Sequence, residues 1–150
     1  MLTNSIILRW VNTLAHFTQN YVNNKLHEQG LGGAQIGMII FLLKNDGVNQ
    51  DEIAKFICKD KSSVGRSLKK LNELGYIDRV QSKSDRRNFH IHLTEKAHSL
   101  APTLFKTLNE WTSIITKDIT DEERELTQKV LELMVSNAKN SLENCNQEKQ

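Results

Sequence analysis

Residues 60–74 combine hydroxyl and cationic side chains at helical spacing. In the segment DKSSVGRSLKKLNEL, Val64, Leu68 and Leu71 lie three and four residues apart, which places them on one side of a helix. The remaining surface carries Lys61, Ser62, Ser63, Arg66, Lys69 and Lys70. Hydroxyl groups bond to phosphates or base edges, and an arginine can hold guanine with two hydrogen bonds. The segment therefore predicts a helix whose polar face binds the groove of a nucleic acid.

The flanking residues indicate how this helix is held. Asp60 can cap its start, and Gly75 suits the left-handed residue at its end. Asn49 and Glu52 have the spacing of a capping box, which predicts a short helix with its apolar face within residues 53–57. A short helix, a tight turn and a longer basic helix together make a helix-turn-helix.

Two short strands are predicted after the basic helix. Residues 76–81 form the first, and residues 88–93 form the second, in which apolar and polar residues alternate. Residues 82–87 between them include no apolar side chain, so this connection can project from the fold. It contains Lys83, Asp85, Arg86 and Arg87. The pattern predicts a β-wing beside the helix-turn-helix.

Long helices are predicted on both sides of this unit. Apolar residues recur at helical steps within residues 5–29, and glycines then interrupt the pattern. The segment 34–44 is apolar nearly all round, which predicts a buried helix. One helix is expected from Thr94 to about Lys117, and another after the capping box at residues 120–123. The predicted fold class is mainly α with a small β-wing.

The positive charge of the chain is concentrated around the basic helix and the wing. The 150 residues have a formal net charge of +2. Residues 55–87 carry ten Lys and Arg against four Asp and Glu, whereas residues 95–150 carry seven against ten. A basic stripe of this kind is typical of a nucleic-acid interface. Charge alone fits a solvated helix face equally well.

Several other classes of protein are disfavoured by the sequence. Two cysteines are too few for a disulfide scaffold, and the N-terminal residues lack the features of a signal peptide, so we expect a cytoplasmic protein. The longest apolar run is too short to span a membrane. The five histidines lack the helical spacing of strong zinc motifs, and no phosphate-binding loop or nucleophile–base motif is found. We therefore expect no catalytic residues, cofactor or metal.

The segments DKSSVGRSLKKLNELGYIDR and DRRNFHIHLTEKA fall in the order and at the spacing of a recognition helix and a wing. With helices on both sides, the chain resembles the MarR family of bacterial transcription regulators. The resemblance implies a single domain over residues 1–150. Its DNA-binding lobe would occupy about 34–94, and about 1–30 and 95–145 would form the dimerisation helices.

The resemblance also implies how such a protein works. A homodimer would place each helix 60–74 in a major groove and each wing 82–88 in a minor groove of a pseudo-palindromic operator. Arg87 would enter the minor groove, and Asp85 would hold the wing tip in shape. The expected role is repression, relieved by a small-molecule effector. The alternative is a winged-helix module that binds protein, which the basic segment and the polar tip argue against.

The resemblance leaves the sensing mechanism open. A ligand pocket between the DNA-binding lobe and the dimer helices would be lined by Trp10, Phe17, Met38 and Phe41, although ordinary core packing is the simpler interpretation of each. Cys58 is followed by Lys59 and Lys61, whose charges favour a reactive thiolate, but a small packing residue is the simpler interpretation. Two departures from the family pattern, Ala97 in place of Gly and Gly32-Gly33 in place of a Ser or Thr cap, affect helix entry only.

Overall fold

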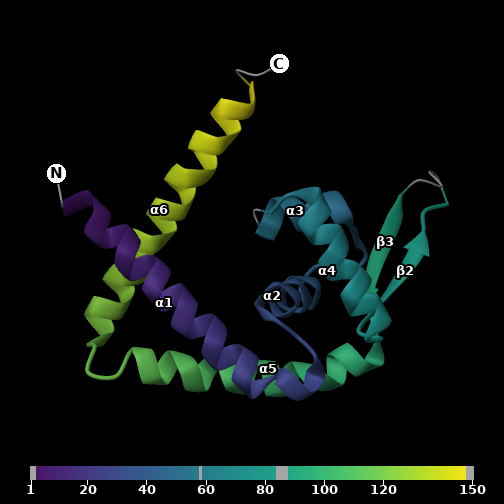
Figure 1. Cartoon of the computed structure of the whole chain (residues 1–150), viewed down its shortest axis with the longest axis horizontal. Helices are drawn as coiled ribbons and strands as arrows, with labels where there is room; N and C mark the ends of the chain where they lie inside the picture. The colour runs from purple at the N-terminus through teal and green to yellow at the C-terminus, as the bar shows by residue number, and fades with distance from the viewer. Residues whose placement is uncertain (1–2, 58, 84–87, 148–150) are drawn as a thin grey trace. The chain divides into compact units, whose positions relative to one another are not determined.

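The computed structural model describes residues 3–57, 59–83 and 88–147, which are mostly helical (Figure 1). Its elements, in chain order, are α1 (Thr3–Lys25), the 3-10 helix η1 (His27–Gln29), α2 (Gly33–Leu42), β1 (Val48–Asn49), α3 (Gln50–Ile57), α4 (Lys61–Glu73), β2 (Ile77–Gln81), β3 (Phe89–Leu93), α5 (Glu95–Ile115) and α6 (Asp121–Gln147). Within these residues, every helix is too short or too polar to cross a membrane. The predicted fold class, a helical protein with a small β-wing, is confirmed.

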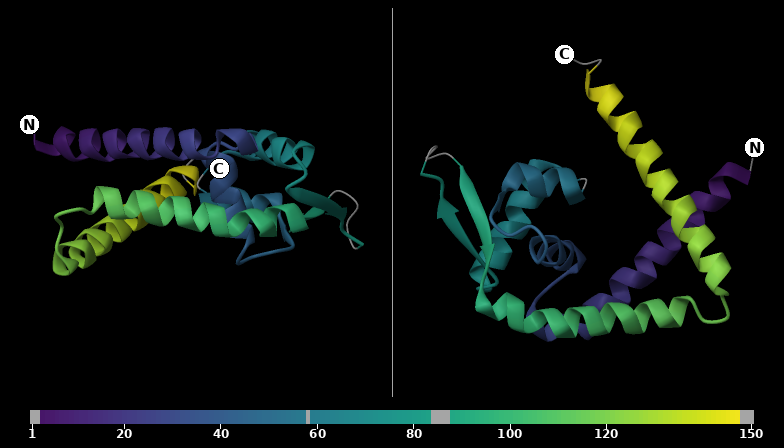
Figure 2. Two further views of the ribbon diagram at one scale, coloured as in Figure 1. Left: turned by 90° about the horizontal axis from the view of Figure 1, so that it is seen from below. Right: turned by 180° about the vertical axis from the view of Figure 1, so that it is seen from behind.

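The chain forms two compact units, Met1–Trp111 and Thr112–Gln150. The boundary lies inside α5, so the first unit holds α1 to most of α5, and the second holds the end of α5 together with α6. The first unit contains the helix-turn-helix and the wing, which lie together in both views of Figure 2. All described contacts of the candidate site belong to this unit.

The core of the first unit surrounds α2. The prediction that this helix is buried is confirmed, because Met38, Ile39 and Leu42 have no exposed surface. They pack in one cluster with residues of α3, α4 and β3, among them Ile53 and Ile91. A helix that contacts neighbours on several sides needs apolar residues around most of its circumference, which explains its lack of a polar face.

The sheet has three antiparallel strands in the order β1-β3-β2. Val48 and Arg79 both face Ile91 of the central strand across their respective ladders. Sequence patterns did not predict β1, because two residues are too few to show alternation. The prediction of a two-stranded wing is thus correct for β2 and β3 but incomplete.

Side chains of β3 fasten the turn that leads into β1. The Nδ1 atom of His92 lies 2.7 Å from a carboxylate oxygen of Asp46, whose other oxygen accepts the N–H of Leu93 at 2.8 Å. The Nδ1 atom of His90 lies 2.8 Å from the carbonyl oxygen of Gly47. Gly47 has a φ of 78°, and an added Cβ atom would lie 2.9 Å from the His92 ring. The two histidines therefore stabilise the turn that places β1 beside β3.

The helix ends agree largely with the predicted caps. Asn49 and Glu52 exchange backbone-to-side-chain hydrogen bonds of 2.8 and 3.0 Å, as a capping box requires. The first helix is shorter than predicted, ending at Lys25, and the next residues tighten into η1. Gly33 is the first residue of α2 and so belongs to a helix. There the side chain of Gln35 accepts the N–H of the N-cap residue Gly32 at 3.0 Å, which supplies the Gln half of a capping box, while Gly32 has no side chain to supply the other half.

Helix α1 is fastened to α5 by an aromatic contact. The indole Nε1–H of Trp111 donates to the hydroxyl of Thr18 at 2.8 Å, and the ring stacks on Tyr21 with centroids 4.7 Å apart. Lys25 lies 3.8 Å from Glu110 beside them. The C-terminal half of α1 thus packs on α5, whereas much of its N-terminal half remains exposed.

The Asp46 contacts predict a pH-dependent contribution to stability. Partial burial acts to raise the pKa of Asp46, but the hydrogen bonds from Leu93 and His92 and the charges of His92 and His98 lower it below its ordinary value of 3.8. A depressed pKa stabilises the fold above the unfolded-state pKa, and this stability is lost as the pH falls through the folded-state pKa.

We therefore expect Asp46→Ala to lower the free energy of unfolding by about 1 kcal/mol at pH 7. Below about pH 4 the difference from the wild type should shrink. Urea unfolding at pH 7 and pH 3 measures both values, with Asp78→Ala on the exposed edge of β2 as the control. Equal losses in the two variants at both pH values would contradict this role.

Candidate nucleic-acid interface

The buried side of α4 fixes the direction in which its polar side points. Val64, Leu68 and Leu71 have no exposed surface and belong to the core of the first unit. Their positions follow the helical repeat, so the residues between them must face outward. The outward residues that are exposed are Lys61, Ser62, Arg66, Lys69 and Lys70, while Ser63 is half-buried. The predicted amphipathic helix is confirmed, and its polar face is solvent-accessible.

The turn between α3 and α4 is held by a side chain of α3. The amide Nε2 of Gln50 donates to the carbonyl oxygen of Lys61 at 3.0 Å, at the first turn of α4. Gly65 faces the same amide, and an added Cβ atom would lie 3.3 Å from it. A side chain at residue 65 would therefore crowd the Gln50 amide and disturb its bond to Lys61. The two helices form the predicted helix-turn-helix.

The far end of α4 is fastened by the start of α5. Gly75 has a φ of 74°, as expected for the residue that ends the helix. The Thr94 hydroxyl donates to the carbonyl of Gly75 at 2.7 Å, and Lys96 donates to that of Leu74 at the same distance. The Lys96 ammonium also lies over the Tyr76 ring, 4.5 Å from its centroid. Both ends of α4 are thus fixed by side chains from other elements.

A chain of hydrogen bonds runs along the first turns of α4. The Asp60 carboxylate accepts the backbone N–H of Ser63 at 2.8 Å and the Ser63 hydroxyl at 2.7 Å. The Arg66 guanidinium donates to the hydroxyls of Ser62 and Ser63 at 2.9 and 3.0 Å. The predicted cap at Asp60 is confirmed, and the predicted DNA-contacting residues Ser62, Ser63 and Arg66 are brought together.

Hydrogen bonding also sets the charge state of Asp60. The bonds from the side chain and the backbone of Ser63 lower the pKa of the carboxyl below its ordinary value, with the Arg66 charge adding to the effect. The group is therefore ionised at neutral pH. A carboxylate accepts hydrogen bonds and donates none, so the direction of each bond in this chain is fixed.

Two lysines on the same face lie near acidic side chains. The Nζ atom of Lys61 lies 3.1 Å from a carboxylate oxygen of Asp51 on α3, and that of Lys69 lies 3.9 Å from Glu73. These side chains are largely exposed, and exposed ion pairs contribute little to stability. Both lysines can therefore exchange a carboxylate for a phosphate at small cost.

The wing extends β2 and β3 by one further backbone bond. The N–H of Ser82 donates to the carbonyl of Asn88 at 2.8 Å, and the Ser82 side chain is buried. The expectation that every residue of 82–87 projects is therefore wrong for Ser82, because it continues the strand pairing. Lys83 is exposed as predicted. Asp85, Arg86 and Arg87 lie outside the described residues.

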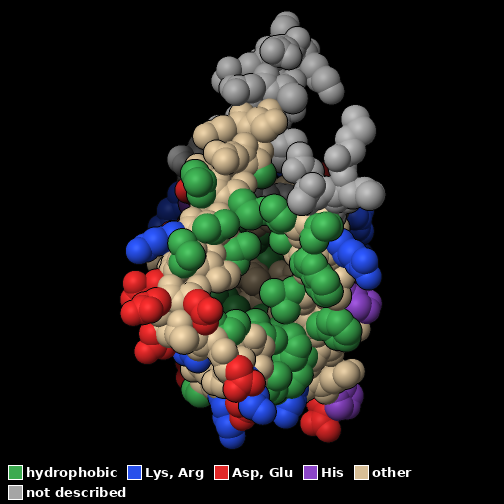
Figure 3. Space-filling model, turned by 90° about the vertical axis from the view of Figure 1, so that its left-hand side faces the viewer, with side chains coloured by type: hydrophobic (Ala, Val, Ile, Leu, Met, Phe, Trp, Pro, Cys, Tyr) green, Lys and Arg blue, Asp and Glu red, His purple; other side chains and the backbone are tan. Residues whose placement is uncertain are grey.

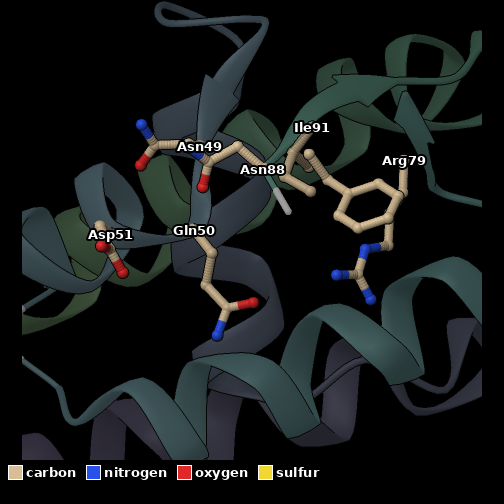
Figure 4. Close-up of a pocket in the computed structure, with 7 residues that line it drawn as sticks. Asn49, Gln50, Asp51, Arg79, Asn88 and Ile91 are labelled. Atoms are coloured by element: carbon tan, nitrogen blue, oxygen red, sulfur yellow. The ribbon is translucent and has the colours of Figure 1, made fainter. Parts of the chain in front are cut away.

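A polar pocket of about 170 Å³ lies between the wing and the start of α3. Its lining residues are Asn49, Gln50, Asp51, Arg79, Asn88, Phe89 and Ile91. Figure 4 shows Gln50 and Arg79 reaching into the space from opposite sides. The Arg79 guanidinium lies 4.9 Å from the centroid of the Phe89 ring. The sequence pattern does not predict the role of Arg79, because its contact with Phe89 is diagonal across the β2–β3 pair, where Arg79 itself lies opposite Ile91.

The four residues predicted to line a ligand pocket occupy different environments. Met38 and Phe41 are buried in the core of the first unit, where Phe41 stacks on Phe56 with centroids 4.2 Å apart. Trp10 and Phe17 are 61% and 57% exposed on α1. None of the four lines the pocket described above. Cys58 lies outside the described residues.

Comparisons with known proteins agree with this geometry. The sequence profile described as MarR family matches residues 29–88, which include the helix-turn-helix and the first strand of the wing, β2. A MarR transcriptional regulator from Methanosarcina mazei is 30% identical in sequence and superimposes with a TM-score of 0.84, over 89% of this chain and 96% of that one. The chain belongs to the MarR family. It is a transcription regulator of the DNA-binding class, and such regulators are not enzymes.

Other relatives of this MarR-family regulator extend the comparison. The HTH-type transcriptional regulator YybA of Bacillus subtilis is 24% identical over 79% of each chain. A MarR-family regulator from Listeria monocytogenes, solved in complex with a 26mer DNA, is 22% identical and has a TM-score of 0.84 over 89% of each chain. The latter likeness shows that the fold is shared.

The Asp51–Lys61 ion pair leads to a prediction about DNA affinity. Asp51→Asn removes the carboxylate that competes with phosphate for Lys61, so the affinity for random-sequence DNA should rise about two- to fivefold at 50 mM salt. At 300 mM salt the gain should largely disappear. Fluorescence anisotropy measures both, with Glu110→Gln, which removes a carboxylate paired with Lys25, as the control. Equal gains in both variants would show that only net charge matters.

Proposed function

We propose that this MarR-family regulator is a homodimer that recognises a specific DNA sequence. Helix α4 would enter the major groove, with Lys61, Ser62, Arg66 and Lys69 against bases and phosphates. The wing would enter the adjacent minor groove, with Arg87 inserted and Lys83 and Arg86 near the backbone. The observation that carries the proposal is the exposed, hydrogen-bonded Arg66 on a helix whose other side is locked into the core.

The shared fold supports binding of DNA through this face. The Listeria relative forms a complex with DNA, and its fold matches nearly the whole chain. Minor grooves carry a negative potential that attracts guanidinium groups, and the wing sequence supplies two adjacent arginines. Asp85, which precedes these arginines, would hold the wing tip in shape. Because the DNA target of a bacterial regulator lies in the cytoplasm, a cytoplasmic location is part of the proposal.

Exposed apolar side chains support a dimer. On α1 they include Ile7, Trp10, Leu14 and Phe17, and on α6 they include Leu126, Val130 and Leu133. Figure 3 shows hydrophobic side chains at the surface of the chain. Clustered apolar side chains at a protein surface are typical of an interface with another protein. A two-fold dimer would read a pseudo-palindrome with half-sites about one helical turn apart.

Repression and release by an effector complete the proposal. A dimer bound over a promoter excludes polymerase, and a small molecule that favours another spacing of the two α4 helices would weaken DNA binding. Such a ligand shifts the equilibrium only by its difference in affinity for the two states. Trp10, Phe17, Met38 and Phe41 remain the proposed surroundings of that ligand, with the α1 residues covered once the dimer forms.

A titration of the purified protein against DNA from upstream of its own gene tests the proposed function. We expect competitor-resistant binding at one dimer per site, at least about 1,000-fold tighter than to random DNA. The affinity should fall steeply with salt, by about 0.9 log units per log unit of salt for each phosphate contacted. If that DNA and sequences from a random-library selection all bind no better than random DNA, the protein is not a sequence-specific regulator.

The same assay tests the wing. Arg87→Ala should lower operator affinity about tenfold or more, because a guanidinium is lost from the minor groove. Arg124→Ala removes the same charge from α6 and is the control. Operator affinity that is unchanged in Arg87→Ala would show that the wing does not bind DNA in this way.

A further inference from the structure

The hydrogen bonds around Ser63 can run in only one direction. The Ser63 hydroxyl has a single hydrogen, which it donates to the Asp60 carboxylate at 2.7 Å. The Ser63 oxygen then accepts from the Arg66 guanidinium at 3.0 Å, and Arg66 makes a second bond of 2.9 Å to Ser62. Since a guanidinium only donates and a carboxylate only accepts, Ser63 transmits the orientation of Asp60 to Arg66.

We propose that Asp60 is a positioning residue for base recognition, which holds the Arg66 guanidinium through Ser63 in the orientation that meets the base edge. This inference rests on the proposed function and deepens it, because it names a residue that sets sequence specificity without touching the bases. It also changes the role of Ser63 from a DNA contact to a relay.

Arg66 keeps enough donors for DNA while it is held. A guanidinium carries five N–H groups, and the two serine bonds use one on each terminal nitrogen. The remaining three suffice for a two-bond contact with guanine. Arg66 is exposed, so these groups are accessible. A side chain ordered before binding loses less conformational freedom on binding, which favours the correct sequence.

The negative charge of Asp60 makes it possible to separate two effects on DNA binding, namely the orientation of Arg66 and the electrostatic effect on phosphates. A carboxylate at the start of α4 repels phosphates, so it weakens binding to every DNA sequence. Orientation of Arg66 strengthens binding only to the sequence whose base edge matches. Asp60 should therefore lower the affinity for DNA of any sequence while it raises the preference for the matching sequence. A residue that only capped the helix would not change these two quantities in opposite directions.

Asp60→Asn tests this separation with little change in the helix cap, since Asn caps helices as well as Asp does. The amide offers one oxygen where the carboxylate offers two, so one of the two bonds from Ser63 is lost. The measured quantity is the ratio of the dissociation constant for random DNA to that for duplexes selected by the wild type from a random library. We expect this ratio to fall about three- to tenfold, with affinity for random DNA equal or higher.

Three further variants complete the test. Ser63→Ala breaks the relay and keeps the charge, and it should lower the ratio to a similar extent. Asp78→Asn removes the same charge from β2 and should leave the ratio unchanged. In an Arg66→Ala background, Asp60→Asn should leave the ratio unchanged, because the group that it positions is gone. Thermal unfolding of each variant verifies the fold.

A measurement without DNA makes the test independent of the operator. In the free protein, ¹⁵N relaxation of the Arg66 side chain should show increased motion in Asp60→Asn and Ser63→Ala, but not in Asp78→Asn. Suppose that the wild type discriminates between sequences, but that Asp60→Asn and Ser63→Ala change neither the motion of Arg66 nor the ratio. This result would overturn the present inference and leave the proposed function intact. A wild type without sequence preference would overturn the proposed function and this inference together.

Discussion

The burial of one stripe of α4 is the constraint on which the rest of the interface depends. Val64, Leu68 and Leu71 are fully enclosed. Loss of such a side chain costs about 2–5 kcal/mol, against a total stability of about 5–15 kcal/mol for a typical domain. The helix therefore cannot rotate about its axis without large cost. The buried side chains of α4 therefore determine which of its residues, including Arg66, face the solvent.

Polar contacts at the helix ends refine what the core establishes. Gln50 fixes the turn before α4, and Thr94 and Lys96 fix the turn after it. The wing is fastened separately, by the Asp46 contacts that hold β1 beside β3. The helix and the hairpin thus pack on one core and expose separate surfaces to solvent. A recognition helix and a wing need this combination to enter two neighbouring grooves.

Much of this arrangement is predictable because it follows from local rules. Residues within four positions of one another along the chain determine several of these features. They are the caps at Asp60 and Asn49, the inner face of α4 and the alternation of β3. The missed features depend on distant residues. Strand β1 exists because β3 offers partners for it far along the chain, with Val48 opposite Ile91 and Asn49 opposite His90. Ser82 is buried because it bonds across the hairpin. The link from Asp60 to Arg66 required side-chain positions, although its members were all recognisable as polar.

In the proposed dimer, two copies of α4 bind DNA through their polar faces, with a wing beside each. Hydroxyl-radical footprinting of the bound dimer on its selected sequence is the sharpest test of this arrangement. We expect two major protected patches about one helical turn apart on the same face of the duplex, flanked by protection in the minor groove. A single patch, or protection that is continuous around the duplex, would contradict it.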